Sequence, residues 1–463
     1  MNYESRDYMR RKIERIHFIG IGGIGMSGIA EVLLNLGYRV SGSDIQETEI
    51  TKRLRSLNVK VWYGHEAKHV KDAQVVVTST AVSNDNPEVV AAEAEGIPVI
   101  PRAEMLAELL KMKASVAVSG CHGKTTTTSM IASVLSFAGL DPTMVVGGKL
   151  LSMGSNARLG SGGIIVAEAD ESDGSFLGLA PLIAVITNID REHLDYYRDI
   201  EDIKDAFIRF ANSVPFYGAA IVCIDCPHVR AILPKIKRRV ITYGMTGEAD
   251  YRAFDVAFEN MTSRYSLSCG GEPVGNVTLR VPGLFNVYNS LAAIAAAREL
   301  DVPFREAQEG IGTFSGVHRR LEVKGSKNNV LVVDDYGHHP TEIRETLKTA
   351  RQVWSGRLVV VFQPHRYSRT KALLADFAGA FDEADEVILT DIYGAGEKPI
   401  PGINASLLRE TLERAGHPRV RYIKTFDEIV ATLRRETSPG DTLITLGAGT
   451  IWQVGEMFLE NEA

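Results

Sequence analysis

Residues 114–137, ASVAVSGCHGKTTTTSMIASVLSF, place narrow limits on the fold of this chain. An apolar stretch that predicts a strand meets the glycine-rich sequence GCHGKTT, and the residues after it predict a helix. Glycines let a backbone approach an anion closely, and the first N–H groups of a helix direct partial positive charge at it. In a loop of this kind the lysine, here Lys124, can reach the β- and γ-phosphates of a nucleotide, and the threonine that follows, here Thr125, can bind Mg²⁺. We therefore predict a phosphate-binding loop made of Gly120, Cys121, His122, Gly123, Lys124, Thr125 and Thr126.

A second glycine motif lies near the N-terminus, in HFIGIGGIGMSGIA at 17–30. Gly20, Gly22 and Gly25 have the spacing of a dinucleotide-binding turn, and Asp44 follows at about 20 residues, where an acidic residue can bind a ribose hydroxyl. Hydride transfer does not need the second nucleotide site that the loop at 120–126 predicts. We therefore predict that the first turn holds the diphosphate of a nucleotide-linked substrate and that ATP binds the second loop, while an NAD-dependent dehydrogenase remains an alternative.

Strands alternate with helices along most of the chain, which predicts parallel sheets with right-handed crossovers. The stretch SRYSLSCGGEPVGNVTLRV alternates apolar and polar residues around a Gly-Gly pair, which predicts an antiparallel hairpin. A length of 463 residues suits about three domains. We predict an α/β protein with an N-terminal Rossmann-like domain at 1–112, a central P-loop-like mononucleotide-binding sheet with the added hairpin at 113–320, and a C-terminal Rossmann-like domain at 321–463.

The net charge of −7 argues against a nucleic-acid partner, because binding to phosphates relies on an excess of basic residues. The apolar region near the N-terminus is interrupted by many glycines, which distinguishes it from the apolar region of a secretory signal. No run reaches the ~18 apolar residues of a membrane span. We therefore expect a cytoplasmic protein with small-molecule substrates and without a membrane partner, either a monomer or a weak homodimer.

Acidic side chains follow a predicted strand in AEADESD, at Glu168, Asp170, Glu171 and Asp173. The next strand end, TNIDREHLDYY, adds His193. Ligands of α/β sheets sit at the carboxyl ends of the strands, and Mg²⁺ prefers hard oxygen ligands. These residues predict a magnesium site that includes His193, although a solvated acidic loop is an alternative for the first cluster.

Four further motifs accompany these: PGLFNVYN, GVHRRLE, DDYGHHPTE and FQPHRYSRT. The combination resembles the Mur ligase family over roughly residues 15–455. The resemblance implies a three-domain, ATP-dependent amide ligase that binds a UDP sugar, ATP and an amino acid in successive domains. It is closest to the member that activates the carboxylate of UDP-N-acetylmuramate as an acyl phosphate and joins it to L-alanine, the first stem residue of peptidoglycan.

Carried over motif by motif, the resemblance assigns roles around ATP. The implied Mg²⁺ ligands are Thr125, Glu168 and His193. The implied catalytic residues are Lys124, His193, Arg319 and Asp335. Besides the phosphate loop, the residues implied to contact ATP are Asn286 and Asn289 on the adenine side, with Arg319 and Asp335 from the third domain.

The implied substrate-binding residues form two groups. For the UDP sugar they are Gly22, Gly23, Ser43, Asp44, His65, Ser79 and Thr80. For the other substrate groups they are Asn188, Tyr336, His338, Arg366 and Arg369. A planar guanidinium matches a carboxylate, so Arg366 or Arg369 is predicted to bind the carboxylate of alanine.

Two alternatives stay open beside the dehydrogenase. A related ligase attaches a ready-made tripeptide to the same sugar, and a nucleotide-binding regulatory protein would perform no chemistry. Cys121 also stands where the family commonly has threonine. A helix N-terminus lowers the pKa of a thiol, so we predict a reactive Cys121 that ATP protects.

Overall fold

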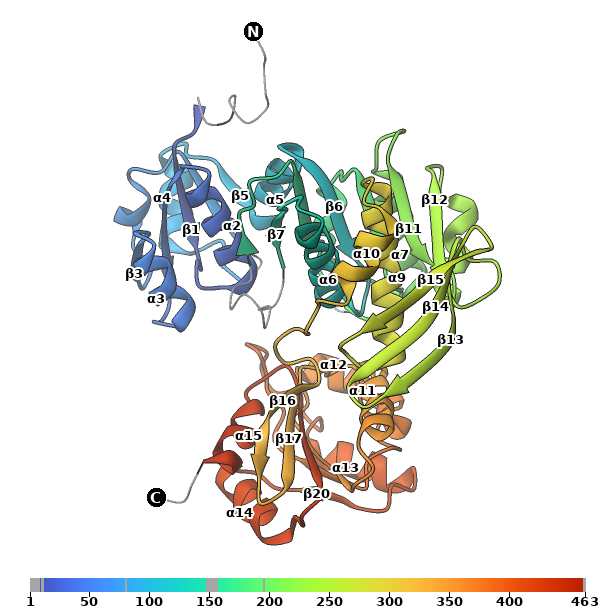
Figure 1. Cartoon of the computed structure of the whole chain (residues 1–463). Coiled ribbons are helices and arrows are strands. Elements are labelled where there is room, and N and C mark those ends of the chain that lie inside the picture. Colours follow the sequence, from blue (N-terminus) through green and yellow to red (C-terminus); the bar gives the residue numbers. More distant parts are fainter. Residues whose placement is uncertain (1–8, 10–11, 80, 147–156, 195, 461–463) are drawn as a thin grey trace.

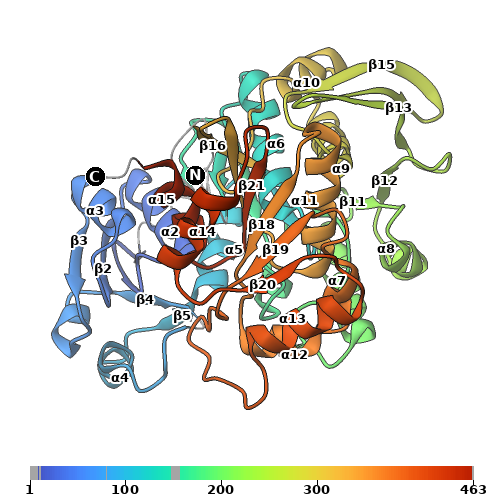
Figure 2. The same cartoon turned by 90° about the horizontal axis from the view of Figure 1, so that it is seen from below.

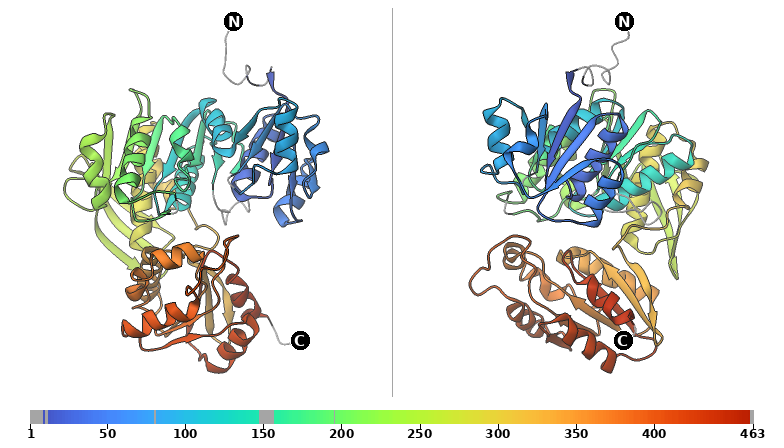
Figure 3. Two further views of the ribbon diagram at one scale, coloured as in Figure 1. Left: turned by 180° about the vertical axis from the view of Figure 1, so that it is seen from behind. Right: turned by 90° about the vertical axis from the view of Figure 1, so that its left-hand side faces the viewer.

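The computed structural model of the chain describes residue 9 and residues 12–79, 81–146, 157–194 and 196–460. This part contains three sheets of five, ten and six strands. The N-terminal part lies beside the central part in Figure 1, and the C-terminal part lies below them. Figure 3 shows the same arrangement from behind and from one side, and in Figure 2, seen from below, the C-terminal part lies in front of the central part. None of the described helices has the length and apolarity that crossing a membrane requires.

The N-terminal sheet has the strand order β3-β2-β1-β4-β5, and each of these strands runs parallel to its neighbours. Both faces are buried: Ile16 and Phe18 pack on one side, and Ile19 packs with Val76 and Val89 on the other. This confirms the Rossmann-like prediction. The elements are β1 (Arg15–Ile19), α2 (Ile24–Asn35), β2 (Arg39–Asp44), α3 (Glu49–Ser56), β3 (Lys60–Tyr63), η1 (Ala67–Val70), β4 (Val75–Thr78), α4 (Pro87–Ala94), β5 (Val99–Pro101) and α5 (Arg102–Lys111).

The central sheet has the order β15-β14-β13-β12-β11-β10-β6-β9-β7-β8, parallel from β7 to β13 and antiparallel at both ends. Gly270 and Gly271, both with positive φ, form the predicted hairpin turn. The elements of its first half are β6 (Ala114–Ser119), α6 (Lys124–Phe137), β7 (Thr143–Val145), β8 (Ala157–Arg158), β9 (Ile164–Glu168), η2 (Ser175–Gly178), β10 (Ile183–Ile186) and α7 (Ile200–Asn212).

The second half of the central part carries the antiparallel extension and two closing helices. Its elements are β11 (Ala219–Cys223), α8 (Pro227–Ile232), η3 (Leu233–Lys235), β12 (Val240–Gly244), β13 (Tyr251–Glu259), β14 (Thr262–Cys269), β15 (Glu272–Leu279), α9 (Leu284–Glu299) and α10 (Phe304–Ile311). Val116 and Val118 of β6 face the core of α6 and α9, and Ala117 faces α7. Burial on both faces explains why these strands are continuous apolar runs.

The C-terminal sheet has the order β16-β17-β21-β18-β19-β20; the edge strand β16 is antiparallel to β17, and the other neighbouring strands are parallel. Helices α11 and α13 pack on one face, and α14 and α15 on the other. The elements are β16 (Glu322–Lys327), β17 (Val330–Asp335), α11 (Pro340–Val353), β18 (Leu358–Phe362), α12 (Tyr367–Ala372), η4 (Asp376–Gly379), β19 (Glu386–Leu389), α13 (Ala405–Arg414), β20 (Val420–Tyr422), α14 (Phe426–Glu436), β21 (Thr442–Leu446) and α15 (Trp452–Leu459).

The three-domain α/β prediction is confirmed, but some elements differ from the expectation. Helix α9 begins at Leu284, so Asn286 and Asn289 of the PGLFNVYN motif lie within its first turns and not in a loop before it. Strands β16 and β20 were not predicted, because EVKGSK lacks alternating apolar residues and VRY is very short. The exact domain boundaries at 112/113 and 320/321 stay a prediction.

Strands β10, β6 and β9 are neighbours, so their carboxyl ends meet at one edge of the central sheet. The phosphate loop, the AEADESD loop and the TNIDREH loop all leave from this edge. The topology therefore brings three sequence motifs, separated along the chain, to one place.

Candidate active site

The phosphate loop adopts a backbone that requires glycine at two positions. Gly120 has φ +134° and Gly123 has φ +82°. A Cβ at Gly120 would lie 2.0 Å from Thr187 Oγ1, and one at Gly123 would lie 2.7 Å from Asn289 Oδ1. Gly123 also offers no side chain to cap α6. The first N–H groups of this helix are therefore available to an anion.

Lys124 and Thr125 begin α6 and meet acidic side chains from the AEADESD loop. The Nζ of Lys124 donates to Gly120 O at 2.8 Å and to Glu171 Oε1 at 2.7 Å. Thr125 Oγ1 donates to Glu168 Oε2 at 2.8 Å. Burial disfavours the charge on Lys124, but Glu171 and its acidic neighbours outweigh burial and raise the pKa of this lysine. Lys124 therefore stays charged where it would meet a phosphate.

His193 lies in the TNIDREH loop after β10, with a positive φ of +54°. Its Nε2 lies 3.5 Å from Glu171 Oε1. Burial alone would lower the pKa of His193, but the hydrogen bond to Glu171 and the charge of Glu192 raise it. In this structure His193 is thus paired with Glu171.

The residues around Thr125 have the chemistry that a hard divalent cation requires. Thr125 and Glu168 bring two oxygen atoms within 2.8 Å of each other, and Glu171 Oε2 is buried without a hydrogen-bond partner among the described residues. Hydroxyl and carboxylate oxygens are the preferred ligands of Mg²⁺. Because His193 contacts Glu171 here, its predicted role as a third ligand stays a prediction.

The asparagines predicted at substrate or nucleotide contacts fix the loop and its surroundings. Asn188 accepts from His122 N at 2.9 Å and donates to His122 O at 3.0 Å. Asn289 accepts from Thr127 Oγ1, and Asn286 donates to Pro282 O. Thr126, the last residue of the predicted phosphate loop, is buried. These contacts hold the phosphate loop against β10 and α9, while the ligand contacts of the three asparagines stay predictions.

Asp190 connects the central part to the C-terminal part. Its Oδ2 accepts from His122 Nε2 at 2.9 Å and from Thr341 Oγ1 at 2.8 Å. His339 adds a weaker contact to Arg191 O at 3.4 Å. Burial lowers the pKa of His122, but the bonds to Asp190 and Glu342 outweigh it and raise this pKa to about 10. The phosphate loop is therefore tied to the start of α11 through charged groups.

Replacing Asp190 with asparagine is expected to loosen this junction. The loss of charge-assisted hydrogen bonds should lower the free energy of unfolding by about 2 kcal/mol at pH 7 and increase the radius of gyration. Folding raises the pKa of His122 from the ordinary imidazole value of 6.5 to about 10. The ion pair between His122 and Asp190 therefore stabilises the fold fully below pH 6.5, and this contribution disappears as the pH rises through about 10. Thermal unfolding and small-angle scattering between pH 7 and 10.5 measure both effects.

The control for this change is Asp205→Asn, since the Asp205 carboxylate is exposed and lies 3.8 Å from Lys235. This control should leave stability and scattering almost unchanged. A wild type and a D190N variant with equal scattering curves and melting temperatures at pH 7 would show that Asp190 does not hold the two parts together.

Arg319 and Asp335 are held inside the C-terminal part. Arg319 donates to Asp334 Oδ2 at 2.8 Å and to Gly447 O at 2.6 Å, and its guanidinium lies 5.1 Å from the centre of the Tyr336 ring. Asp335 is buried and accepts from the backbone N–H groups of Leu321 and Gly337. Burial raises the pKa of Asp335 to about 6. Both residues order the loops at this sheet edge, and their predicted contacts with ATP stay untested.

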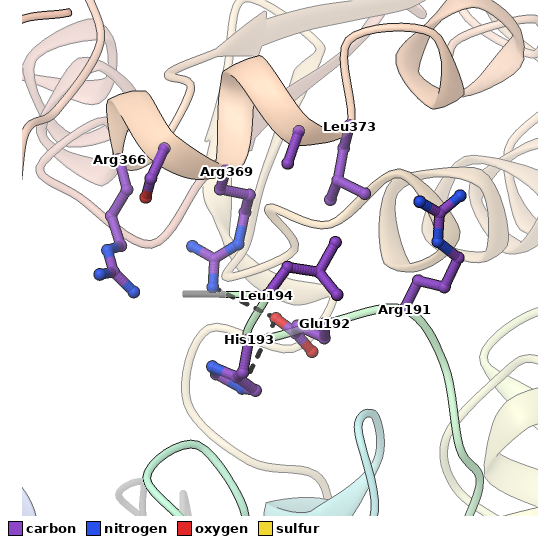
Figure 4. A pocket seen from close by; sticks show the side chains of 9 residues that line it. Arg191, Glu192, His193, Leu194, Arg366, Arg369 and Leu373 are labelled. Carbon is purple, nitrogen blue, oxygen red and sulfur yellow. Dashed lines mark hydrogen bonds and ion pairs between the residues drawn. The ribbon is translucent and has the colours of Figure 1, made fainter. Parts of the chain in front are cut away.

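A cavity of about 120 Å³ opens where the central and C-terminal parts meet (Figure 4). Arg369 donates to Glu192 Oε1 at 3.2 Å across this junction. Arg366 points to the same side in Figure 4 and donates to Glu397 at 2.6 Å. Two guanidinium groups thus approach a small space. Its lining residues are Arg191, Glu192, His193, Leu194, Arg366, Ser368, Arg369, Ala372 and Leu373.

Glu192 is a residue of this cavity that the sequence analysis did not single out. Its carboxylate is buried and lies 3.9 Å from His338 Nε2 and 4.0 Å from His193 Nε2. Burial alone would raise its pKa, but the charges of His122, His193 and Arg369 lower it to about 2. Burial lowers the pKa of His338 to about 4. The only sequence signal for Glu192 was its position beside His193.

Four of the predicted UDP-sugar residues, Gly22, Ser43, Asp44 and His65, lie at or next to the first glycine turn. Gly22 N donates to Asp44 Oδ2 at 2.8 Å, so Asp44 contacts the turn itself. Gly20 N donates to Ser43 O at 2.8 Å, and Ser43 Oγ lies 3.0 Å from His65 Nδ1. Gly23 precedes α2, Ser79 follows β4, and Thr80 lies outside the described residues.

The prediction of a reactive Cys121 is wrong in its physical premise. The thiol is buried, accepts from Asp190 N and donates to Asp190 O. Burial, with the charges of Glu171 and Glu192, raises the pKa of Cys121 well above its ordinary value. A thiol without charge is a poor nucleophile, so the helix N-terminus does not activate it here.

Three family models match the chain in succession. They are the Mur ligase family catalytic domain at residues 15–114, the Mur ligase middle domain at 118–297, and the Mur ligase glutamate ligase domain at 319–449. Curated relatives cover almost the whole chain. The UDP-N-acetylmuramate–L-alanine ligase of Syntrophus aciditrophicus (strain SB) is 62% identical over 453 residues, which are 98% of this chain and 94% of the relative.

Other relatives agree with these matches. The UDP-N-acetylmuramate–L-alanine ligase of Geobacter sp. (strain M21) is 57% identical over 97% of this chain and 98% of its own length. The crystal structure of the UDP-N-acetylmuramate-alanine ligase MurC from Thermotoga maritima superposes with a TM-score of 0.82, at 31% identity over 96% of this chain and 98% of that one. The murein peptide ligase of Psychrobacter arcticus 273-4 has a TM-score of 0.71 at 23% identity, which shows a shared fold, with 96% and 98% covered.

Proposed function

Because the chain belongs to the Mur ligase family, we propose that it uses ATP to join L-alanine to UDP-N-acetylmuramate, giving UDP-N-acetylmuramoyl-L-alanine, ADP and phosphate. The observation that carries this proposal is the 62% identity to a ligase of that name over 98% of the chain. This reaction is the first amino-acid addition in peptidoglycan precursor synthesis. The two glycine motifs are explained by it, because one substrate is linked to UDP and the other is ATP.

The chemistry requires two anions to approach each other. A carboxylate is a poor acyl donor, so its oxygen attacks the γ-phosphate of ATP, ADP leaves, and the acyl phosphate carries a good leaving group. The amine of alanine then attacks the acyl carbon, and phosphate departs. Lys124, at the N-terminus of α6, supplies fixed positive charge where these phosphates would lie. Mg²⁺, when held by Thr125, Glu168 and His193, would neutralise further negative charge.

We propose that each of the three domains binds one of the three substrates. We assign the UDP sugar to residues 1–112, ATP to 113–320 and the amino acid to 321–463. Arg366 or Arg369 is proposed to bind the alanine carboxylate, supported by the approach of both side chains to a small cavity beside His193. Tyr336 and His338 are proposed to shape that pocket. We further propose a cytoplasmic location, a role in cell wall formation during growth and division, and a monomer or weak homodimer.

Removal of divalent cations is expected to abolish turnover, and Mg²⁺ is expected to restore it. Glu168→Gln keeps the shape of the side chain but removes its charge, so the Mg²⁺ concentration for half-maximal activity should rise about a hundredfold. A titration of activity with Mg²⁺ measures this. The control is Glu201→Gln, because Glu201 is exposed and pairs with Lys204 on α7. Full activity after complete chelation would contradict the metal proposal.

The proposed substrates are tested by phosphate release from ATP. Wild-type protein should release phosphate with UDP-N-acetylmuramate and L-alanine together, and should release none when either is omitted. The tripeptide L-Ala-γ-D-Glu-meso-diaminopimelate in place of L-alanine should support no turnover. Turnover with the tripeptide alone would identify a tripeptide-attaching ligase and contradict the assignment of the amino-acid pocket. Nicotinamide binding without ATP turnover would favour the dehydrogenase.

A further inference from the structure

A fully buried carboxylate lies beside the first glycine turn, at Glu88 in the first turn of α4. Its Oε2 accepts from Ser43 Oγ at 2.5 Å and lies 3.3 Å from His17 Nε2. Its Oε1 lies 2.6 Å from His69 Nδ1 and accepts from Glu66 N at 3.3 Å. A carboxylate without exposure is costly unless every oxygen has partners, and here both oxygens have them.

The two oxygens of Glu88 face different surroundings. The Oε1 side leads to His69, which is buried and stacks on Trp62 at a ring distance of 4.6 Å. The Oε2 side leads to Ser43, whose backbone oxygen also accepts the N–H groups of Gly20 and Ile21. One side is therefore interior packing, and the other side touches the turn to which we assign the UDP sugar.

The hydrogen atoms along the Oε2 side have one consistent arrangement. Burial disfavours the charge of Glu88, but hydrogen bonds from His17, Ser43 and His69 outweigh it and lower the pKa of this carboxyl to about 2. An ionised carboxylate only accepts, so the single hydroxyl hydrogen of Ser43 goes to Glu88. Ser43 Oγ must then accept from His65 Nδ1, 3.0 Å away. His65 Nδ1 consequently carries a hydrogen.

This arrangement decides which ring nitrogen of His65 is available to a ligand. Both of its described contacts, with Ser43 Oγ and with Glu88 Oε2 at 3.6 Å, are made through Nδ1. The side chain is 19% exposed, whereas those of Ser43 and Glu88 are buried. His65 Nε2 is thus the atom of this chain of contacts that is left for a ligand.

We infer that Glu88 is a positioning residue for the UDP sugar, which acts through Ser43 to hold His65 with Nδ1 inward and Nε2 toward the nucleoside diphosphate. The inference rests on the proposed function, because it takes the first domain as the UDP-sugar site. Glu88 itself touches no substrate in this arrangement. Its loss should therefore weaken binding of the UDP sugar without changing the chemistry at the distant phosphate loop.

The test replaces Glu88 with methionine, which has a similar length but no charge and offers Ser43 only a weakly accepting thioether sulfur. Calorimetric titration with UDP and with UDP-N-acetylmuramate should give a Kd about tenfold or more above that of the wild type. The KM for UDP-N-acetylmuramate should rise by the same factor, while kcat and the KM for ATP should stay within about twofold. Glu88→Gln, whose carbonyl oxygen can still accept from Ser43, should recover part of the affinity.

The matched control is His69→Phe, which keeps a ring against Trp62 but removes the partner of Oε1. It should lower the melting temperature as E88M does, yet leave the Kd for UDP-N-acetylmuramate within about twofold of the wild type, because stability and positioning are separate effects. Equal losses of affinity in H69F and E88M would overturn the inference, since Glu88 would then act only through stability.

A double-mutant cycle decides whether Glu88 acts through His65. In a His65→Gln background, E88M should change the Kd by less than about twofold, since two residues in one chain of contacts are coupled. Equal effects of E88M in both backgrounds would overturn the inference.

If E88M does not fold, the cycle of Ser43→Ala with His65→Gln tests the same contacts, and additive losses would overturn the inference. A wild type that binds no UDP-N-acetylmuramate would overturn the proposed function itself and the inference with it, whereas equal binding by wild type and E88M would overturn the inference alone.

Discussion

Replacing Lys124 with methionine is expected to lower kcat by about a thousandfold, because a fixed positive charge at the phosphates is a large part of transition-state stabilisation. The Nζ of Lys124 is held by Gly120 O and Glu171 Oε1, so it is oriented before ATP arrives. Methionine fills similar volume without charge. The free energy of unfolding should therefore change by less than the activation free energy of the reaction. Phosphate release at saturating substrates measures kcat, and thermal unfolding measures the stability.

The control for K124M is Lys235→Met, which removes an exposed lysine of the same domain whose nearest partner, Asp205, is also exposed. This variant should keep wild-type kcat, since exposed ion pairs contribute little. The KM for ATP should rise in K124M as well, because the ground state also carries phosphate charge. A K124M protein that is folded and turns over within tenfold of the wild type would remove Lys124 from the mechanism.

Replacing Arg369 with lysine is expected to raise the KM for L-alanine about a hundredfold while the KM for ATP stays the same. Arg369 meets Glu192 across the domain junction and lies 3.0 Å from His365 Nδ1, which fixes the plane of its guanidinium. A lysine keeps the charge but cannot present two parallel N–H groups to a carboxylate. Steady-state kinetics with each substrate varied in turn measures the change.

Arg414→Lys is the matched control, because Arg414 forms an exposed pair with Glu410 on α13. It should change no kinetic constant. Arg366→Lys separates the two candidates for the carboxylate: the variant with the larger increase in the KM for alanine identifies the residue that binds it. Unchanged values for alanine in both arginine variants would show that the carboxylate binds elsewhere.

Local sequence patterns predicted much of the fold. The loop at 120–126 is recognisable because its structure depends on residues that are adjacent in the sequence. Gly120 and Gly123 adopt positive φ, and α6 begins directly after them. Apolar runs such as Ala114–Ser119 predicted buried strands, since both faces of a parallel sheet are covered. The same local reasoning failed at β16, where EVKGSK gives no apolar alternation. That edge strand exists because β17 pairs with it in an antiparallel register.

The sequence by itself determined the phosphate loop, the three α/β parts and the membership in the Mur ligase family, because these depend on motifs of adjacent residues. Only the tertiary structure decided which side chains meet. Glu192 contacts Arg369 from a position 177 residues earlier, and Glu88 contacts His17 across 71 residues. Such contacts have no spacing signal, because they are created when strands from distant segments pair in one sheet or when two domains pack together. The burial that raises the pKa of Cys121 arises in the same way, so the helix N-terminus alone gave the wrong prediction for that thiol.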